Sequence, residues 1–107
     1  MIRSTIQDNF GIRINPDFCE VLVCGRKLEL TKKEFEMLVY FMINKNRVLS
    51  KQSIIEHLWE GIALDSDSYD FVYTHIKNLR KKILLQGGKD YIRTVYGLGY
   101  SFKTQGD

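Results

Sequence analysis

The sequence YIRTVYGLGYSFK at residues 91–103 constrains the fold more than any other part of the chain. Aromatic and β-branched residues dominate this run, and Gly97 and Gly99 interrupt it near its middle. Runs of this kind on both sides of a glycine-containing turn are typical of two antiparallel strands. The sequence therefore predicts a β-hairpin, and Arg93 and Lys103 give that hairpin positive charge.

A capping box opens the first predicted helix. Because Thr31 and Glu34 are three residues apart, the Thr31 hydroxyl can accept from the Glu34 amide while the Glu34 carboxylate reaches back. Apolar residues then recur at helical spacing, at Phe35, Leu38, Val39, Met42 and Ile43. This pattern predicts an amphipathic helix that ends near residues 44–46.

Two more helices are expected before the hairpin. Ser50 is a suitable N-cap for a short second helix, and the polar stretch at residues 60–68 predicts a loop. A third helix is predicted over residues 68–85, and a stop signal follows it at Gln86, Gly87 and Gly88. The core is predicted to contain residues from all three helices, namely Phe35, Leu38, Val39, Leu58, Val72, Ile76 and Leu79.

The third helix has two contrasting faces. Val72, Ile76, Leu79 and Ile83 fall on one side at about 100° per residue and form the predicted buried stripe. The opposite face and its flanks carry polar and charged residues, namely Asp70, Thr74, Lys77, Asn78, Lys81, Arg80 and Lys82. Such a helix can present donors and acceptors to nucleic-acid bases and phosphates, although a solvated amphipathic helix has the same pattern.

The N-terminal part of the chain predicts a small antiparallel sheet. Short β-type runs cover residues 10–15, 18–24 and 27–30, with turn residues between them. We assign residues 1–9 to a tail or the remnant of an interdomain linker, and residues 10–107 to one domain.

Cys19 and Cys24 would lie ~16 Å apart on one strand, too far for a disulfide. They are therefore predicted to be small buried side chains in a reducing cytosol.

The charge of the chain is unevenly distributed. Residues 1–76 have nine basic and eleven acidic residues, whereas residues 77–103 have seven basic residues and one acidic residue, Asp90. A concentrated basic patch is the electrostatic signature of a protein that binds a polyanion, although an ordinary solvated face remains an alternative. No apolar run approaches the roughly 18 residues of a membrane span, so we expect a cytoplasmic protein without membrane contact.

Three helices, the last of them basic, followed by a charged hairpin indicate an α+β winged helix-turn-helix with an N-terminal antiparallel sheet. The motifs LTKKEFEMLVYFMINKNRVLSKQSIIEHLW, HIKNLRKKI and YIRTVYGLGYSF resemble the C-terminal DNA-binding domain of OmpR/PhoB-class bacterial response regulators. The resemblance covers residues 10–103. It implies the effector domain of a two-component transcriptional regulator, which binds double-stranded DNA sequence-specifically, often as a head-to-tail tandem dimer. The third helix would then enter the major groove, and the hairpin would contact the backbone or minor groove.

The resemblance also implies site residues. Thr74, Lys77, Asn78 and Arg80 match positions in the third helix that contact bases or phosphates. Lys51 stands near a helix start that usually approaches phosphate, and Thr94 matches a hairpin position associated with the DNA backbone. The positive charges of Lys81 and Arg93 add them to the predicted DNA contacts. The loop Glu60 to Asp67 matches the segment that can touch RNA polymerase.

The sequence departs from the family pattern in three respects. Asp70 is acidic where the family often has a basic residue, and Tyr96 replaces a frequent arginine in the turn of the hairpin. A receiver domain with a phosphorylatable aspartate is missing. We expect the full-length protein to contain it, and the alternative is a regulator without phosphoryl control.

Other classes of protein fit the sequence less well. No nucleophile, base and orienting group can be assembled, and Gly97 and Gly99 lack the strand-to-helix context of a nucleotide site, so we predict neither catalysis nor a cofactor or metal. His57 and His75 lie on different helices and are predicted to be packing or helix-flank residues. A protein-interaction module with an acidic partner, and the cytoplasmic part of a membrane-anchored regulator, remain alternatives.

Overall fold

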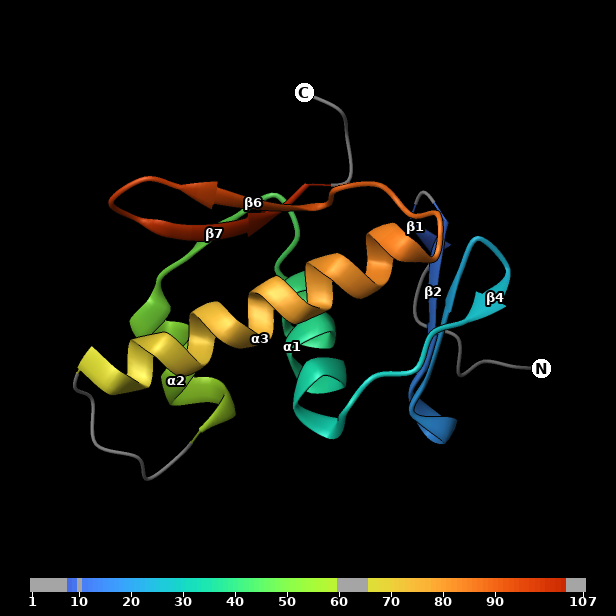
Figure 1. The fold of residues 1–107 in the computed structure, drawn as a ribbon, viewed down its shortest axis with the longest axis horizontal. Helices are drawn as coiled ribbons and strands as arrows, with labels where there is room; N and C mark the ends of the chain where they lie inside the picture. The colour runs from blue at the N-terminus through green and yellow to red at the C-terminus, as the bar shows by residue number, and fades with distance from the viewer. Residues whose placement is uncertain (1–7, 10, 60–65, 104–107) are drawn as a thin grey trace.

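The computed structural model describes residues 8–9, 11–59 and 66–103. Figure 1 shows a sheet at one end of the molecule, helices that extend from it toward the other end, and a hairpin that lies along one side of the longest helix. This arrangement is the predicted α+β winged helix-turn-helix. The elements in chain order are β1 (Asp8–Asn9), β2 (Ile12–Asn15), the 3-10 helix η1 (Pro16–Phe18), β3 (Glu20–Val23), β4 (Arg26–Lys27), α1 (Lys32–Ile43), β5 (Val48–Leu49), α2 (Lys51–Leu58), α3 (Ser66–Leu85), β6 (Ile92–Val95) and β7 (Gly99–Phe102).

The N-terminal sheet is an antiparallel meander in the order β1-β2-β3-β4. Alternate residues of β2 and β3, such as Ile12 and Val23, are buried, as expected for a sheet with one face on the core. The strands differ from the predicted ranges at both ends. β1 adds residues 8–9, which the sequence placed in the tail, and β4 ends at Lys27 rather than residue 30. Phe10 lies outside the described residues.

Cys19 and Cys24 are exposed and free, so the prediction that they are buried is wrong. The two residues flank β3 instead of lying within it, and their φ angles are 50° and 53°. Both therefore occupy left-handed turn positions at the ends of β3, and the exposed Cys24 thiol donates to the carbonyl oxygen of Gly87 at 3.4 Å.

The capping box of α1 is present as predicted. The Glu34 amide donates to Thr31 Oγ1 at 3.1 Å, and the Thr31 amide donates to Glu34 Oε1 at 3.0 Å. The pair fixes the first turn of the helix, because it satisfies two amides that have no partner within the helix.

The buried face of α1 is rotated from the predicted one. Met37, Leu38, Phe41 and Met42 are buried, whereas Phe35 and Val39 are only partly buried against the core. Ile43, which belonged to the predicted stripe, is 68% exposed. Apolar residues cover most of the circumference of α1, so helical spacing alone fits two neighbouring faces. Tertiary packing selects the face on which Glu34 is also buried.

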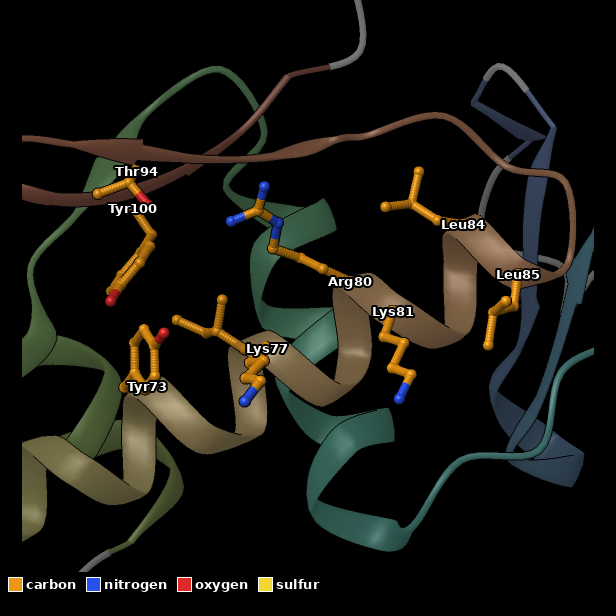
Figure 2. Close-up of a pocket in the computed structure, with 9 residues that line it drawn as sticks. Tyr73, Lys77, Arg80, Lys81, Leu84, Leu85, Thr94 and Tyr100 are labelled. Carbon is orange, nitrogen blue, oxygen red and sulfur yellow. The ribbon is translucent and has the colours of Figure 1, made fainter.

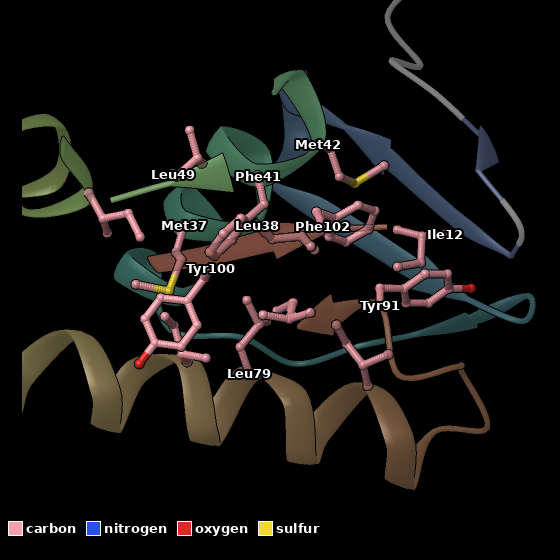
Figure 3. Close-up of a cluster of buried hydrophobic side chains, with 14 of the residues drawn as sticks. Ile12, Met37, Leu38, Phe41, Met42, Leu49, Leu79, Tyr91, Tyr100 and Phe102 are labelled. Atoms are coloured by element: carbon pink, nitrogen blue, oxygen red, sulfur yellow. The ribbon is translucent and has the colours of Figure 1, made fainter. Parts of the chain in front are cut away.

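α3 supplies the buried stripe that the sequence predicted. It starts at Ser66, two residues before the expected start, and Val72, Ile76, Leu79 and Ile83 are each at most 2% exposed. Figure 3 shows side chains from α1, α3 and the hairpin meeting in one cluster, among them Phe41, Leu79 and Phe102. α3 is therefore anchored along one side, and its other side is available to solvent.

The C-terminal hairpin forms as predicted, and it gains a third strand. β6 and β7 pair from Ile92↔Phe102 to Val95↔Gly99, and β5 pairs with the other edge of β7. Gly99 permits this contact, because a Cβ atom there would lie 2.1 Å from the carbonyl oxygen of Leu49. Across the described residues, no helix is long and apolar enough to span a bilayer.

Candidate nucleic-acid interface

The solvent face of α3 carries the predicted reading residues. Thr74, Lys77, Asn78 and Lys81 are all exposed, on the side of the helix opposite the buried stripe. Asp70 is exposed near the start of the same helix. The short polar side chains and the two lysines therefore form one surface, interrupted at one end by a carboxylate.

A groove separates α3 from the hairpin. It has a volume of about 450 Å³, and Figure 2 shows its lining residues, which come from both elements. Ile76, Leu84 and Tyr100 contribute apolar surface, and Thr94 lines the hairpin side. Three cations also line the groove, namely Lys77, Arg80 and Lys81. The groove thus combines an apolar floor with basic groups, which suits the sugar and phosphate parts of a nucleic-acid strand.

The cations of α3 fall into two groups. Arg80 and Lys82 form ion pairs within the domain, Arg80 with Asp90 at 3.1 Å and Lys82 with Glu34 at 2.6 Å. Lys77 and Lys81 form no ion pair with any residue that the structure describes. The positive field available to a partner along α3 therefore comes chiefly from Lys77 and Lys81.

The Glu34–Lys82 pair joins α1 to α3. The Glu34 side chain is 5% exposed, and its Oε1 accepts from Lys82 Nζ as well as from the Thr31 amide. Burial alone would raise the pKa of Glu34, but the hydrogen bonds from Lys82 and Thr31 outweigh it, so the pKa is lowered. Glu34 is therefore a buried carboxylate that stays ionised and holds α3 against α1.

The hairpin presents its own exposed residues. Arg93 and Thr94 on β6 are exposed, and Tyr96 in the turn is 95% exposed. A second cleft of about 420 Å³ lies between this hairpin and the start of α2, and Lys51 lines it. Five predicted contacts thus line the two clefts, which share Thr94: Lys51, Lys77, Arg80, Lys81 and Thr94 itself. Thr74, Asn78 and Arg93 are exposed but line neither cleft.

His57 is exposed on α2 and His75 is partly buried on α3, and both make ring contacts, as predicted for packing or helix-flank residues. The His57 ring stacks on Tyr40 with ring centroids 4.0 Å apart, and the His75 ring meets Trp59 edge-on at 5.0 Å. The Tyr40–His57 pair joins α1 to α2, and the Trp59–His75 pair joins the C-cap of α2 to α3, which gives both histidines a structural role.

Sequence reasoning missed two residues of this surface. Asp90, the ion-pair partner of Arg80, lies just before the hairpin, and Tyr100 lines the groove. Burial raises the pKa of Tyr100, and Tyr73 adds to that rise, so the Tyr100 phenol stays neutral. Neither role leaves a local sequence signal, because each depends on the hairpin lying against α3. Of the predicted polymerase loop, residues 60–65 lie outside the described residues, whereas Ser66 and Asp67 belong to α3.

Comparison with known proteins places this geometry in a family. Residues 25–102 match the family model described as "Transcriptional regulatory protein, C terminal". The chain is 36% identical over 99 residues to the transcriptional regulatory protein QseB of Haemophilus influenzae, an alignment that covers 91% of this chain and 41% of QseB. It is 41% identical over 85 residues to the regulatory protein VanRB of Enterococcus faecalis, covering 79% of this chain and 36% of VanRB. The chain thus spans about two fifths of the length of these relatives.

Solved structures agree with the sequence relatives. The DNA-binding domain of the response regulator AdeR, solved with an intercistronic region, superposes with a TM-score of 0.77 at 26% identity, covering 87% of this chain and 94% of that one. The RstA DNA-binding domain of Klebsiella pneumoniae, solved with its RstA box, shares the fold with a TM-score of 0.82 at 24% identity, covering 96% of this chain and 100% of that one. This chain therefore belongs to the family of C-terminal DNA-binding domains of OmpR/PhoB-class transcriptional regulators.

Proposed function

We propose that this domain binds double-stranded DNA sequence-specifically, with α3 in the major groove and the β6–β7 hairpin on the backbone or in the minor groove. One observation carries the proposal: Thr74, Lys77, Asn78 and Lys81 share the solvent face of a helix whose opposite side is fixed in the core. A major groove about 12 Å wide admits such a helix. Anchoring one side reduces the freedom that the helix would lose on binding.

The exposed residues of α3 are proposed to make two kinds of contact, to base edges and to phosphates. Asn78 and Thr74 have the short polar groups that discriminate base edges, and Asn in particular suits a bidentate contact with adenine. Lys77 and Lys81 carry the charge that displaces counterions from phosphates. Arg80 lines the groove beside them and is a further proposed phosphate contact.

The remaining proposed contacts surround α3. Arg93 and Thr94 are exposed on β6, where they would meet the DNA backbone, and Lys51 at the first residue of α2 would approach a phosphate. Together these residues extend the contact surface from α3 to both of its neighbouring elements.

Comparison of two variants tests this division. Asn78→Ala should cost about 1 to 3 kcal/mol on the preferred duplex and relax the preference at one or two base pairs, with little change in salt dependence. Lys81→Ala should weaken binding to preferred and unrelated duplexes alike and lower the slope of log affinity against log salt by about one unit.

The measurement is fluorescence anisotropy of both variants on both duplexes across a salt series, after selection of the preferred site from random duplex DNA. If Asn78→Ala leaves the selected sequence and its affinity unchanged, α3 does not read the groove as proposed. The hairpin at residues 91–103 would then be the better candidate for the reading element.

We further propose that the domain acts as the cytoplasmic effector of a two-component regulator, in a full-length protein that also carries a receiver domain. The length of the relatives supports this, because the chain spans about two fifths of each. Two domains would bind direct repeats as a head-to-tail tandem dimer, and the loop Glu60 to Asp67 would contact RNA polymerase. Sedimentation of the domain with one-site and two-site duplexes gives the stoichiometry, and a strict one-to-one complex on the two-site duplex would contradict the tandem dimer.

A further inference from the structure

Asp90 occupies the point where α3 meets the start of the hairpin. Its carboxylate accepts two hydrogen bonds from Arg80, one from Nε to Oδ1 at 3.3 Å and one from Nη2 to Oδ2 at 3.1 Å. Its backbone carbonyl oxygen also accepts from Arg93 Nε at 3.5 Å. Asp90 therefore contacts two of the cations that we propose as DNA contacts, one on α3 and one on β6.

The paired edge of Arg80 leaves other donors available. A guanidinium group is planar and has five N–H donors in a fixed arrangement, so one carboxylate can occupy only one edge. Asp90 takes the edge formed by Nε and Nη2, and the N–H groups of Nη1 make no hydrogen bond to Asp90. Arg80 lines the groove between α3 and the hairpin, and its side chain is 35% exposed. In Figure 2 its guanidinium extends toward the hairpin, whereas the ammonium groups of Lys77 and Lys81 point away from it.

We propose that Asp90 is a positioning residue for DNA binding, which holds Arg80 so that the remaining edge of its guanidinium meets a phosphate in the groove. This inference rests on the proposed function. A free arginine side chain loses much rotamer freedom when it binds, and a side chain that is already oriented loses less. The pair is partly exposed, so it contributes little stability of its own, and its effect on orientation is the larger consequence.

A positioning role for Asp90 and simple electrostatics predict opposite changes in DNA affinity when Asp90 is replaced by Asn. Asp90→Asn removes a negative charge near the DNA, which by charge alone would strengthen binding. If Asp90 positions Arg80, the substitution should instead weaken binding to the preferred duplex by about threefold to tenfold. It should also lower the salt slope by about one unit, because one phosphate contact is lost. Asp70→Asn is the matched control, since it removes the same charge from the exposed face of α3 without touching Arg80, and it should strengthen binding.

A double-mutant cycle isolates the role of Arg80. In an Arg80→Ala background, Asp90→Asn should no longer weaken binding, and Asp90→Glu in the native background should recover part of the affinity. Thermal melting by circular dichroism checks that each variant is folded. The inference is overturned if Asp90→Asn leaves affinity unchanged or raises it, or if the loss persists without Arg80. The proposed function fails separately, if the wild-type domain shows no salt-dependent duplex binding.

Discussion

Gly99→Ala should destabilise this domain more than any other glycine substitution in the hairpin. An alanine Cβ at this position would lie 2.1 Å from the carbonyl oxygen of Leu49 and 2.9 Å from the Cα of Ser50. Both atoms belong to backbone, so the clash can be relieved only if β5 moves away from β7. The φ of Gly99 is +149°, a conformation in which an L side chain is strained. Strain of this kind costs about 1 to 3 kcal/mol, and forced overpacking costs a similar amount, so we expect a total loss of about 2 to 6 kcal/mol.

Urea unfolding followed by circular dichroism and by the fluorescence of Trp59 measures this loss. Gly97→Ala is the matched control, because its φ of +76° is also positive but nothing lies within 4 Å of its Cβ position. Gly97→Ala should therefore lose only the free energy of unfolding that comes from backbone strain, about 1 kcal/mol. The reasoning is refuted if the two variants lose the same free energy of unfolding, since the close approach of β5 would then have no energetic consequence.

Two other perturbations test the core and the buried ion pair. Leu79→Ala removes a fully buried side chain from the centre of α3 and should cost about 2 to 5 kcal/mol in urea unfolding, and a loss below about 0.5 kcal/mol would contradict the burial of this face. Glu34→Gln keeps the capping box but breaks the ion pair with Lys82, and should cost about 1 to 3 kcal/mol at pH 7. Because the folded-state pKa of Glu34 lies below its ordinary value of 4.5, the stabilisation from its ionised form is fully present above that pH and is lost as pH falls below it. The difference between wild type and Glu34→Gln should therefore shrink below about pH 4.5 in unfolding series from pH 7 to pH 3, and a difference that grows would contradict the pair.

Features that depend on neighbouring residues in the sequence were predicted correctly. The capping box needs only Thr31 and Glu34, and the hairpin needs only a strand-forming run with turn glycines. The buried stripe of α3 was predicted because Val72, Ile76, Leu79 and Ile83 share one face at helical spacing, and the opposite face is mostly polar.

Features that depend on distant residues were not predicted. α1 is apolar around most of its circumference, so the sequence could not decide whether Phe35 or Phe41 is buried. β5 has two residues, too few for a strand pattern, and it exists because β7 offers a free edge and Gly99 allows close approach. The ion pairs of Arg80 and Lys82 join residues that only the tertiary fold brings together.

These ion pairs change how the charge of the chain should be interpreted. The sequence gives α3 four cations, and composition treats all of them as equivalent. In the structure, Glu34 neutralises Lys82 at the contact with α1, and Asp90 orients Arg80 at the contact with the hairpin. Among the described residues of the helix, only the cations Lys77 and Lys81 have no ion-pair partner. α3 should therefore contribute about two to three phosphate contacts, each adding ~0.9 to the salt slope, rather than four. A measured contribution of four from this helix would mean that DNA breaks the Glu34–Lys82 pair, and α3 would then have to shift against α1 on binding.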